Sequence, residues 1–546
     1  MPAIDNVHLD SLLAPDGGRL AKLYSLGSIL VTAYALYLLG LAIYRLWFHP
    51  LAKFPGPAWL AVSDLPFLFL GAYLGRFAAR TLELHRRYGK VVRIGPNRLS
   101  VDGSVGWTDI YAHRPGGDAT EFHKAPGTFA SPDGRSLISA DTRENHRRQR
   151  RALAHAFSEA ALYEQESLII HYVDLFIRRL SENADGGKNP IDMLSWLNYL
   201  TFDIIGDLSL GESFGSLESS SYHFWVRTIL AGIKGVSRLR FFRHSGLGLL
   251  AAIDPDGAIS ALQRNTQYAH QKAEARIALG AEPLTLSTGE VDADGKPKMK
   301  VRRDFMSYMM RKVDTGESLA HDELLHNANT LIVAGSETTG TNLSTLFFEL
   351  ALLRNRAIRD AVTAEVRSQF PREADVTLRS VQANVLPLLH ACLEESLRIH
   401  PPVSEMPPRI SPGATVDGRY VPKGTIVAIY QNATCLNPEH FVDATSFRPE
   451  RFLPPGHPMY DTRLAAGSNM AVFKPFSYGP RDCLGKNLAY AEMRLVAARI
   501  LLRFDVELAE GTREDWLEDQ LAFGIWEKNP LMLRLTERKD LELKGR

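Results

Sequence analysis

The sequence predicts a mostly helical fold with a small β region, preceded by one transmembrane helix at the N-terminus. Residues 23–44 form an uninterrupted uncharged stretch. Helical periodicity dominates residues 160–280 and runs again from about His321 to Leu353. β-branched residues around a Gly-Pro-Asn turn predict a hairpin over Val91–Val101, and alternating apolar residues predict sheet within Gly418–Ile429. These patterns together indicate a membrane anchor joined to a helix-rich body.

The uncharged N-terminal stretch is long enough to cross a bilayer. Its 22 residues lie between Lys22 and Arg45, and at about 1.5 Å per residue a helix of that length spans the ~30 Å hydrocarbon core. A cleaved signal peptide fits less well, because no small-residue cleavage site follows; a buried core helix is the other alternative. We therefore expect an N-terminal segment (1–22), a single-pass anchor (23–44) and a stiff proline-rich linker (45–57).

Composition limits the kind of partner and compartment. The chain has 546 residues, 45% of them hydrophobic and 23% charged, with a formal net charge of +1. This near-neutral balance gives no reason to expect nucleic acid as the main partner. The three cysteines, Cys392, Cys435 and Cys483, form no C-x-x-C pair. So sparse and odd a set argues against a disulfide framework and fits a reducing compartment.

The cysteine near the C-terminus has an unusual setting. Cys483 lies between Gly479 and Gly485 on a Pro-containing turn, and an apolar helical pattern follows at once. A helix N-terminus stabilises a thiolate, and glycines let a flat, bulky group approach the backbone. Such a thiolate is suited to one-sided ligation of a haem iron. The alternative is a free buried cysteine that acts as a small hydrophobe.

Five residues around Cys483 match the spacing of a known family motif. Phe476, Gly479, Arg481, Cys483 and Gly485 reproduce F-x-x-G-x-R-x-C-x-G, and the sequence thereby resembles the cytochrome P-450 monooxygenases at their haem-ligand signature. The resemblance implies the cytochrome P-450 fold, mostly α with a small β region, in one haem-thiolate catalytic domain over residues 58–546. It also implies haem b, with Cys483 as the iron ligand and Phe476, Arg481 and Gly485 as further cofactor-binding residues.

The long helical pattern over residues 321–353 contains poor helix-forming residues at its centre. Its centre, Ala334-Gly-Ser-Glu-Thr-Thr339, places a glycine and paired threonines where helix propensity is poor, which suggests a functional distortion. The stretch matches the family's oxygen-activation motif, in which the glycine leaves room over the iron. The resemblance assigns Glu337 and Thr338 as the catalytic acid–alcohol pair that relays protons to bound O2. A threonine bonded to its own helix backbone is the alternative reading.

Two arginine-containing segments match further family positions. A helix with an Asp-Thr cap is expected over Asp141–Ser158. There, His146 and Arg150 match the positions that contact the haem propionates, although many members have Trp where this chain has His146. Arg409 matches another propionate partner. The remaining arginines of the helix suit a solvated face, a nucleic-acid surface or, as the resemblance favours, the docking of an acidic redox partner.

Another arrangement of charges is assigned to structure. Glu395 and Arg398 are i, i+3 neighbours that a surface pair would also explain. In the family this E-x-x-R pair is buried together with the arginine of P-E-R-F, here Arg451. We therefore expect a buried cluster that supports the fold and haem retention.

Other segments carry weaker signals. Residues 281–303 are polar and are expected to form an exposed loop. The basic and apolar run Arg238–Ile253 fits a membrane-surface contact or a loop over the core. It includes Gly246-x-Gly248-x-x-Ala251, a formal dinucleotide fingerprint that we reject because no strand precedes it. Glu323 and His326 form a single E-x-x-H, where a di-iron site needs two.

The sequence therefore predicts a membrane-anchored haem monooxygenase that oxidises an apolar small molecule with O2. The chain shows no flavin or nicotinamide fold, so electrons are expected from an NADPH-dependent cytochrome P-450 reductase or a cytochrome b-type donor. The wording of Tyr44–Pro57 is similar to fungal members of secondary-metabolite pathways, which implies a polyketide, terpenoid or alkaloid substrate. By the family's habit the catalytic domain faces the cytosol at the endoplasmic reticulum. An O2-independent isomerase or dehydratase and a non-enzymatic haem sensor are the alternatives. Substrate-pocket walls are expected in residues 102–140, 212–253 and 522–526 and after Arg398.

Overall fold

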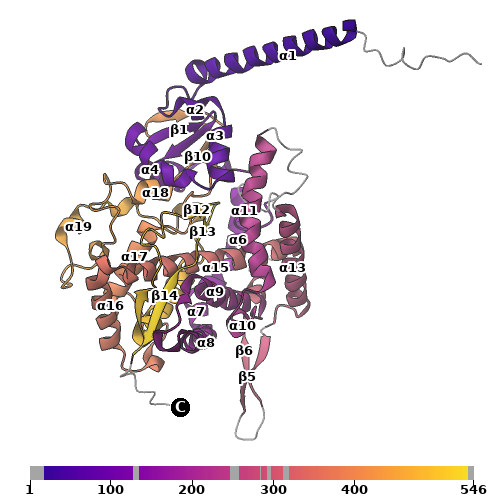
Figure 1. Cartoon of the computed structure of the whole chain (residues 1–546). Coiled ribbons are helices and arrows are strands. Elements are labelled where there is room, and N and C mark those ends of the chain that lie inside the picture. Colours follow the sequence, from indigo (N-terminus) through magenta and orange to yellow (C-terminus); the bar gives the residue numbers. More distant parts are fainter. Residues whose placement is uncertain are drawn as a thin grey trace, which may run out of the picture.

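A computed structural model describes residues 17–126, 134–245, 257–282, 284–291, 297–311 and 319–538. The N-terminal helix α1 (Gly17–Ile43) extends away from the body and continues into the short π-helix η2 (Tyr44–Phe48) (Figure 1). Within the described part of the chain, one helix is long and apolar enough to cross a membrane: it covers Tyr24–Phe48 with a mean hydropathy of 2.0. This span contains all but one residue of the predicted anchor, residues 23–44, and extends four residues beyond it.

The proline-rich segment after the anchor packs onto the body. Leu51 and Phe54 are buried among the residues of the β region. The buried Arg93 donates a hydrogen bond from its Nη1 to the Arg45 carbonyl oxygen at 2.7 Å, and its backbone N–H donates to the Pro55 carbonyl oxygen at 2.7 Å. A Cβ on Gly56 would overlap the backbone of Arg93. The connection between anchor and body is therefore held in place by contacts as well as by its prolines.

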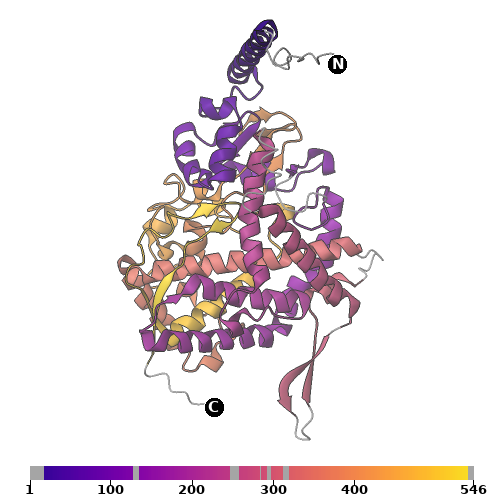
Figure 2. The ribbon, with the colours of Figure 1, turned by 45° about the vertical axis from the view of Figure 1, so that its right-hand side comes forward.

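The body is built around one long helix. Helix α15 (His321–Ala351) crosses it from side to side and packs against α9, α13, α17 and α20 (Figure 2). Its observed bounds confirm the helix expected over 321–353 to within two residues at its C-terminal end. The other helices of six or more residues are α4 (Phe77–Tyr88), α6 (Arg143–Ala154), α7 (Glu159–Glu164), α8 (Glu166–Ala184), α9 (Met193–Leu210), α11 (Phe224–His244), α13 (Ala258–Ala278), α16 (Arg356–Gln369), α17 (Pro387–Ile399) and α20 (Lys486–Arg503).

The β region lies between the anchor and the helical body. Its main sheet has the order β1-β2-β10-β7-β3. The predicted hairpin is confirmed, since β1 pairs antiparallel with β2 in the register Val91↔Val101. The strands of this sheet are β1 (Val91–Gly95), β2 (Arg98–Val101), β3 (His123–Lys124), β7 (Arg409–Ile410) and β10 (Ile426–Ala428). The smaller sheets contain β4 (Ile191–Asp192), β8 (Ala414–Val416), β9 (Arg419–Val421), β11 (Phe504–Leu508), β12 (Leu521–Ala522), β13 (Trp526–Glu527) and β14 (Met532–Glu537).

The expectation of a loop over residues 281–303 is wrong. This segment contains strands β5 (Leu284–Val291) and β6 (Pro297–Arg302), which pair antiparallel and project from the body (Figure 2). The physical reason is visible in the sequence: apolar and polar residues alternate on both sides of an Asp-Gly pair, a pattern that favours a hairpin despite its overall polarity. The rejected fingerprint residues Gly246, Gly248 and Ala251 lie outside the described residues.

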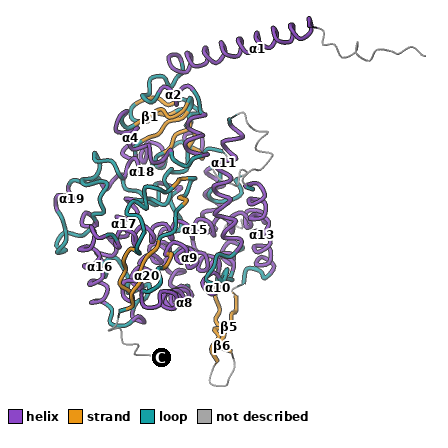
Figure 3. Tube along the Cα trace, in the orientation of Figure 1, coloured by secondary structure: helices purple, strands orange, loops and turns teal. Residues whose placement is uncertain are grey.

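Much of the chain between residues 436 and 485 follows a path with little regular structure (Figure 3). Short helices interrupt it: η10 (Pro449–Phe452), α19 (Thr462–Ala466), η11 (Met470–Val472) and η12 (Gly479–Arg481). The segment packs on α17 and ends at the start of α20. It therefore places the Cys483 turn at the N-terminal end of α20.

Candidate functional site

The turn that carries Cys483 is fixed by its own backbone. The Cys483 N–H donates to the Phe476 carbonyl oxygen at 2.9 Å. Gly479 adopts a left-handed φ of +82°, and a Cβ there would overlap the backbone of Tyr111, so glycine is required at this position. Gly485 precedes the first residue of α20 and has no such neighbour, because its Cβ would meet only Phe157 at 3.9 Å.

Cys483 differs from the other two cysteines in accessibility. Cys392 and Cys435 are buried, whereas Cys483 is exposed. Protein nevertheless surrounds the sulfur on most sides: burial raises the pKa of the Cys483 thiol, against the lowering effects of the Gly485 N–H and of the Arg150 and Lys486 charges. The expected stabilisation of a thiolate by the helix terminus is therefore outweighed by burial in the protein alone, and a bound metal ion would have to replace the thiol proton.

A cluster of cationic side chains lies beside this turn. Arg481 binds the Glu121 carboxylate at 2.6 Å and the Ala140 carbonyl oxygen at 2.7 Å. His146 is buried, and its pKa is lowered to about 2 by burial and by the neighbouring charges, which include Arg481 and Arg409. The structure therefore brings together three of the side chains that the sequence proposed for the cofactor.

Arg150 and Arg409 occupy different positions in this cluster. Arg150 binds Asp482 through the backbone carbonyl oxygen at 2.7 Å and the carboxylate at 2.6 Å. Arg409 is buried, and its Nε and Nη1 atoms have no hydrogen-bond partner among the residues that the structure describes. Unpartnered N–H groups are costly inside a protein, so Arg409 has free donors to offer a ligand.

Lys124 belongs to the same cluster and was missed by sequence reasoning. Its Nζ donates to the carbonyl oxygens of Leu137 and Ile138 at 3.1 and 2.6 Å. Burial, followed by the charges of Arg409 and Arg481, lowers its pKa well below the usual range for lysine. It lies on the two-residue strand β3, which pairs with the strand of Arg409. A strand of two residues leaves no periodic signal in the sequence. Only its pairing with β7 in the structure shows that Lys124 belongs to the cluster.

The cluster has the chemistry to hold a group with two carboxylates. Arg150 and Arg481 are paired with the carboxylates of Asp482 and Glu121, whereas the buried Arg409 forms no ion pair among the described residues, which leaves an excess of positive charge. Cys483, which is an exposed residue, and the open position at Gly485 follow Arg481 along the same turn. These residues fit haem, with one thiolate for the iron and cationic donors for the propionates.

At the centre of α15, the side chains of the two residues proposed for proton transfer bind different partners. Thr338 donates from its hydroxyl to the Ala334 carbonyl oxygen at 2.8 Å, the backbone bond of the alternative reading. The Glu337 carboxylate is buried and forms an ion pair with Lys528 at 2.7 Å. Each side chain therefore has its own partner. Lys528 was not singled out by the sequence.

Gly335 lies where α15 packs against α9. A Cβ at this position would lie 2.7 Å from the Ile205 Cδ1 atom, which belongs to α9. The glycine therefore permits the close packing of α9 on α15, and its expected role of leaving room over the iron stays a prediction. Ala334, its neighbour, is the exposed residue at this point of the helix.

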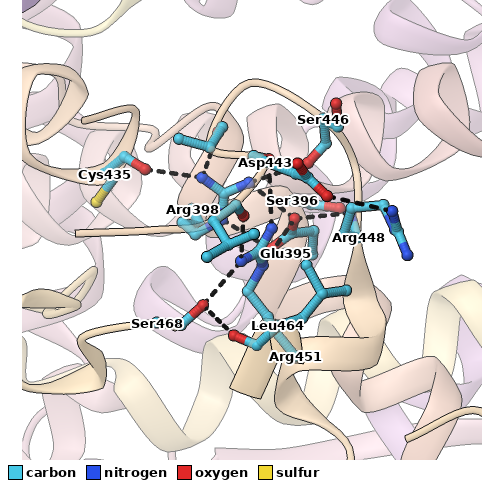
Figure 4. Close-up of polar contacts among 12 residues, drawn as sticks. Glu395, Ser396, Arg398, Cys435, Asp443, Ser446, Arg448, Arg451, Leu464 and Ser468 are labelled. Carbon is cyan, nitrogen blue, oxygen red and sulfur yellow. Dashed lines mark hydrogen bonds and ion pairs between the residues drawn. The ribbon is translucent and has the colours of Figure 1, made fainter. Parts of the chain in front are cut away.

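The buried charge cluster expected from E-x-x-R is present. Arg398 binds Glu395 with two hydrogen bonds of 2.8 Å, and Arg451 reaches the same carboxylate at 3.2 Å; all three side chains are 0% exposed (Figure 4). Arg398 also donates to the carbonyl oxygens of Cys435 and Ala444 at 2.7 and 2.6 Å. The cluster thereby fastens the loop-rich segment that carries Cys483 to helix α17.

Comparison with known proteins places these features in one family. The family model described as Cytochrome P450 matches residues 63–533. The cytochrome P450 monooxygenase astJ of Aspergillus oryzae is 40% identical over 91% of this chain and 94% of its own length. The averantin hydroxylase of Dothistroma septosporum is 36% identical over 95% and 93%, and the trichothecene C-15 hydroxylase of Fusarium sporotrichioides is 37% identical over 92% and 96%.

Proposed function

Because the chain belongs to the cytochrome P450 family, we propose that it hydroxylates, or otherwise oxidises, an apolar intermediate of fungal secondary metabolism. The protein is a haem-thiolate monooxygenase that takes O2, a small-molecule substrate and electrons from a redox partner. The observation that supports our assignment of the site is the single turn that joins the accessible Cys483 to the buried cationic cluster. A polyketide, terpenoid or alkaloid substrate is supported by relatives named as hydroxylases of averantin and of trichothecenes.

We assign haem b to the Cys483 turn. Cys483 is its iron ligand, and Phe476 and Gly485 border it. Arg409, Arg481 and His146 hold the propionates. Arg150 contributes through Asp482. When bound, the haem would supply the oxygen chemistry, with the Cys483 thiolate as the ligand of its iron.

The proton-handling groups are Glu337 and Thr338. The Thr338 hydroxyl lies next to the exposed Ala334, where a substrate has access to the helix. A hydroxyl that accepts one proton while donating another can pass protons without changing its own charge. The Glu337 carboxylate supplies the ionisable group from the neighbouring side of α15. Apolar side chains around the site exclude water from the reacting atoms.

The electron donor in this proposal is an NADPH-dependent cytochrome P450 reductase, with a cytochrome b-type protein as the second candidate. The exposed Arg147 and the partly exposed Arg151 of α6 offer positive charge to an acidic partner. Helix α1 anchors the protein in the endoplasmic reticulum membrane, with the catalytic domain on the cytosolic side. The apolar composition of Tyr24–Phe48 supports the anchoring.

The carbon monoxide difference spectrum of the dithionite-reduced protein tests the cofactor assignment. We expect a strongly red-shifted Soret band that is lost in Cys483→Ala and kept in Cys392→Ala, since Cys392 is buried away from the site. A well-folded wild-type protein without haem, or with an unshifted Soret band, would contradict the assignment.

The use of O2 is tested separately. Membranes that contain the protein and a reductase are supplied with NADPH, fungal small-molecule extract and isotopically labelled dioxygen. We expect products that carry the label and that require the reductase. Unlabelled products formed without reductase would instead indicate the isomerase or dehydratase class.

A further inference from the structure

Among the described residues, the ion pair between Glu337 and Lys528 is the most deeply buried ion pair that helix α15 forms. The Lys528 Nζ and a Glu337 carboxylate oxygen are 2.7 Å apart, and the two side chains are 3% and 2% exposed. Lys528 comes from outside the helix: it directly follows β13, in the C-terminal hairpin whose residues 522–526 were expected to line the substrate pocket. A contact between partners so distant in sequence joins the hairpin to the centre of α15.

Lys528 is fully engaged by this environment. Its ammonium group also donates to the Thr341 hydroxyl at 2.9 Å and to the Trp526 carbonyl oxygen at 3.3 Å, which uses all three of its donors. Thr341 lies one helical turn after Glu337 and donates its own proton to the Glu337 carbonyl oxygen at 2.7 Å. Lys528 therefore holds the Glu337 carboxylate in position and also binds Thr341, which lies on the same side of α15.

The other titratable groups near the pair do not compensate the carboxylate. Tyr222 is a neutral phenol, because burial raises its pKa to about 12, with a further contribution from the Glu337 charge. His400 is neutral, because burial and the Lys528 charge lower its pKa to about 3. Among the described residues, Lys528 is the one cation that forms an ion pair with Glu337. The second carboxylate oxygen, Oε1, has no hydrogen-bond partner among these residues.

Removal of one partner from a buried pair leaves an uncompensated charge, which such a site does not tolerate. A carboxyl group that loses its cation inside a protein takes up a proton instead. It is then also free to leave its position, because the bond to Lys528 was the contact that held it. The position and the charge of Glu337 therefore depend on a residue of the C-terminal hairpin.

We propose that Lys528 is a positioning residue: it keeps Glu337 ionised and directed toward the C-terminal hairpin, away from the Thr338 hydroxyl. The consequence for proton delivery rests on the proposed function, whereas the control of the Glu337 carboxyl group does not. Movement of the hairpin then changes the state of Glu337, so that this segment links the expected substrate wall to the proton-handling side of α15.

Infrared difference spectroscopy of the purified full-length haem protein tests the proposal. The absorption of protonated carboxyl groups is compared between Lys528→Met and the double variant Lys528→Met/Glu337→Gln, and between the wild type and Glu337→Gln. We expect a protonated carboxyl signal in the first comparison and none in the second. Other buried acids cancel in each subtraction, including Glu349 and Glu492, whose pKa values burial raises to about 7 and about 8.

Two matched variants give the controls. Lys528→Arg keeps the cation and is expected to lack the protonated carboxyl signal. Glu527→Gln removes an exposed ion pair with Lys234 at the adjacent residue and is expected to match the wild type. If Lys528→Met does not fold, Lys528→Gln removes the charge while keeping a hydrogen-bonding side chain, and the same signal is expected from it.

A kinetic measurement addresses proton delivery. The solvent deuterium isotope effect on reductase-supported NADPH oxidation is expected to rise in Lys528→Met and to return toward the wild-type value in Lys528→Arg. A haem-loaded, folded Lys528→Met protein without the protonated carboxyl signal would overturn the proposal. Failure of the proposed function appears differently, as a missing thiolate–haem spectrum in the wild type, and leaves the infrared result interpretable.

Discussion

Arg150 binds the residue that precedes Cys483. Its two terminal nitrogens donate to the Asp482 carbonyl oxygen at 2.7 Å and to the Asp482 carboxylate at 2.6 Å. Helix α6 is thereby tied to the turn that presents the cysteine sulfur. The sequence predicts that Arg150 contacts a haem propionate, which stays a prediction; in the structure its guanidinium holds the turn through Asp482.

We expect Arg150→Leu to lower haem occupancy more than it lowers fold stability. The two side chains of the pair are 27% and 43% exposed, and an ion pair so open to solvent contributes only about 0–1 kcal/mol. The turn, however, loses the contact that sets its position. Haem content per protein and the thermal unfolding midpoint are measured together. Arg147→Leu, an exposed residue of the same helix, is the control; equal haem content in both variants would contradict this role for Arg150.

Substitutions of the two glycines on either side of Cys483 are expected to have different effects: one on fold stability, the other on haem binding. Gly479→Ala places a side chain at a left-handed φ of +82° and against the Tyr111 backbone, so we expect a loss of fold stability of about 1–3 kcal/mol or more. Gly485→Val meets nothing in the protein closer than Phe157 at 3.9 Å from its Cβ. It is therefore expected to keep the unfolding midpoint and to lose haem. Denaturant unfolding and the carbon monoxide spectrum separate the two effects, and normal haem content in Gly485→Val would refute the assignment of this position.

Local patterns made the Cys483 turn, the α15 helix and the β1–β2 hairpin predictable from sequence. Each depends on residues close together in the chain, where turn chemistry and periodicity are strong. The contacts of Lys124 and Lys528 were not predictable. Lys528 lies 191 residues from Glu337, and a lone lysine between ordinary residues carries no sign of the partner that the fold will bring to it.

Packing and pairing contacts are the features that the sequence does not reveal. At Gly335 the missing Cβ makes room for Ile205, and the role of this glycine toward the cofactor stays a prediction. The missing side chain of a helical glycine can make room for another helix or for a ligand, and the sequence does not show which of them lies beside it. For the β5–β6 hairpin, the overall polarity of the segment predicts a loop, whereas the alternation of its apolar and polar residues is the pattern that the structure follows.

The buried cluster of Glu395, Arg398 and Arg451 is expected to be the most sensitive structural feature of the fold. Its side chains are 0% exposed, and loss of one partner of such a pair costs about 3–5 kcal/mol. We expect Arg398→Leu to yield little folded protein and no thiolate–haem spectrum. Arg448→Ala is the control, because its partly exposed side chain pairs with Asp443 at 3.4 Å while its backbone N–H still serves Glu395. Comparable losses in both variants would show that the burial of the cluster is not what matters.

His400 is expected to make the protein less stable in acid. Burial and the Lys528 charge lower its pKa to about 3, from 6.5 in an unfolded chain. Between these values the unfolded chain binds more protons than the folded protein, so the free energy of unfolding rises with pH up to about 6.5 and is unaffected by His400 above that. One such group contributes a slope of at most about 1.4 kcal/mol per pH unit.

The variants His400→Phe and His400→Gln separate titration from packing. Both remove the titrating ring, whereas only Phe keeps an aromatic face against Trp526, whose ring centroid lies 4.2 Å away. Denaturant unfolding from pH 4 to pH 8 is therefore expected to give a flatter acid limb in both variants, with a further constant loss in His400→Gln. The slopes should differ from the wild type below about pH 6.5 and agree above it, because in that upper range the histidine is neutral in both states. An unchanged acid limb in both variants would mean that His400 is protonated without cost, which is incompatible with its buried position beside Lys528.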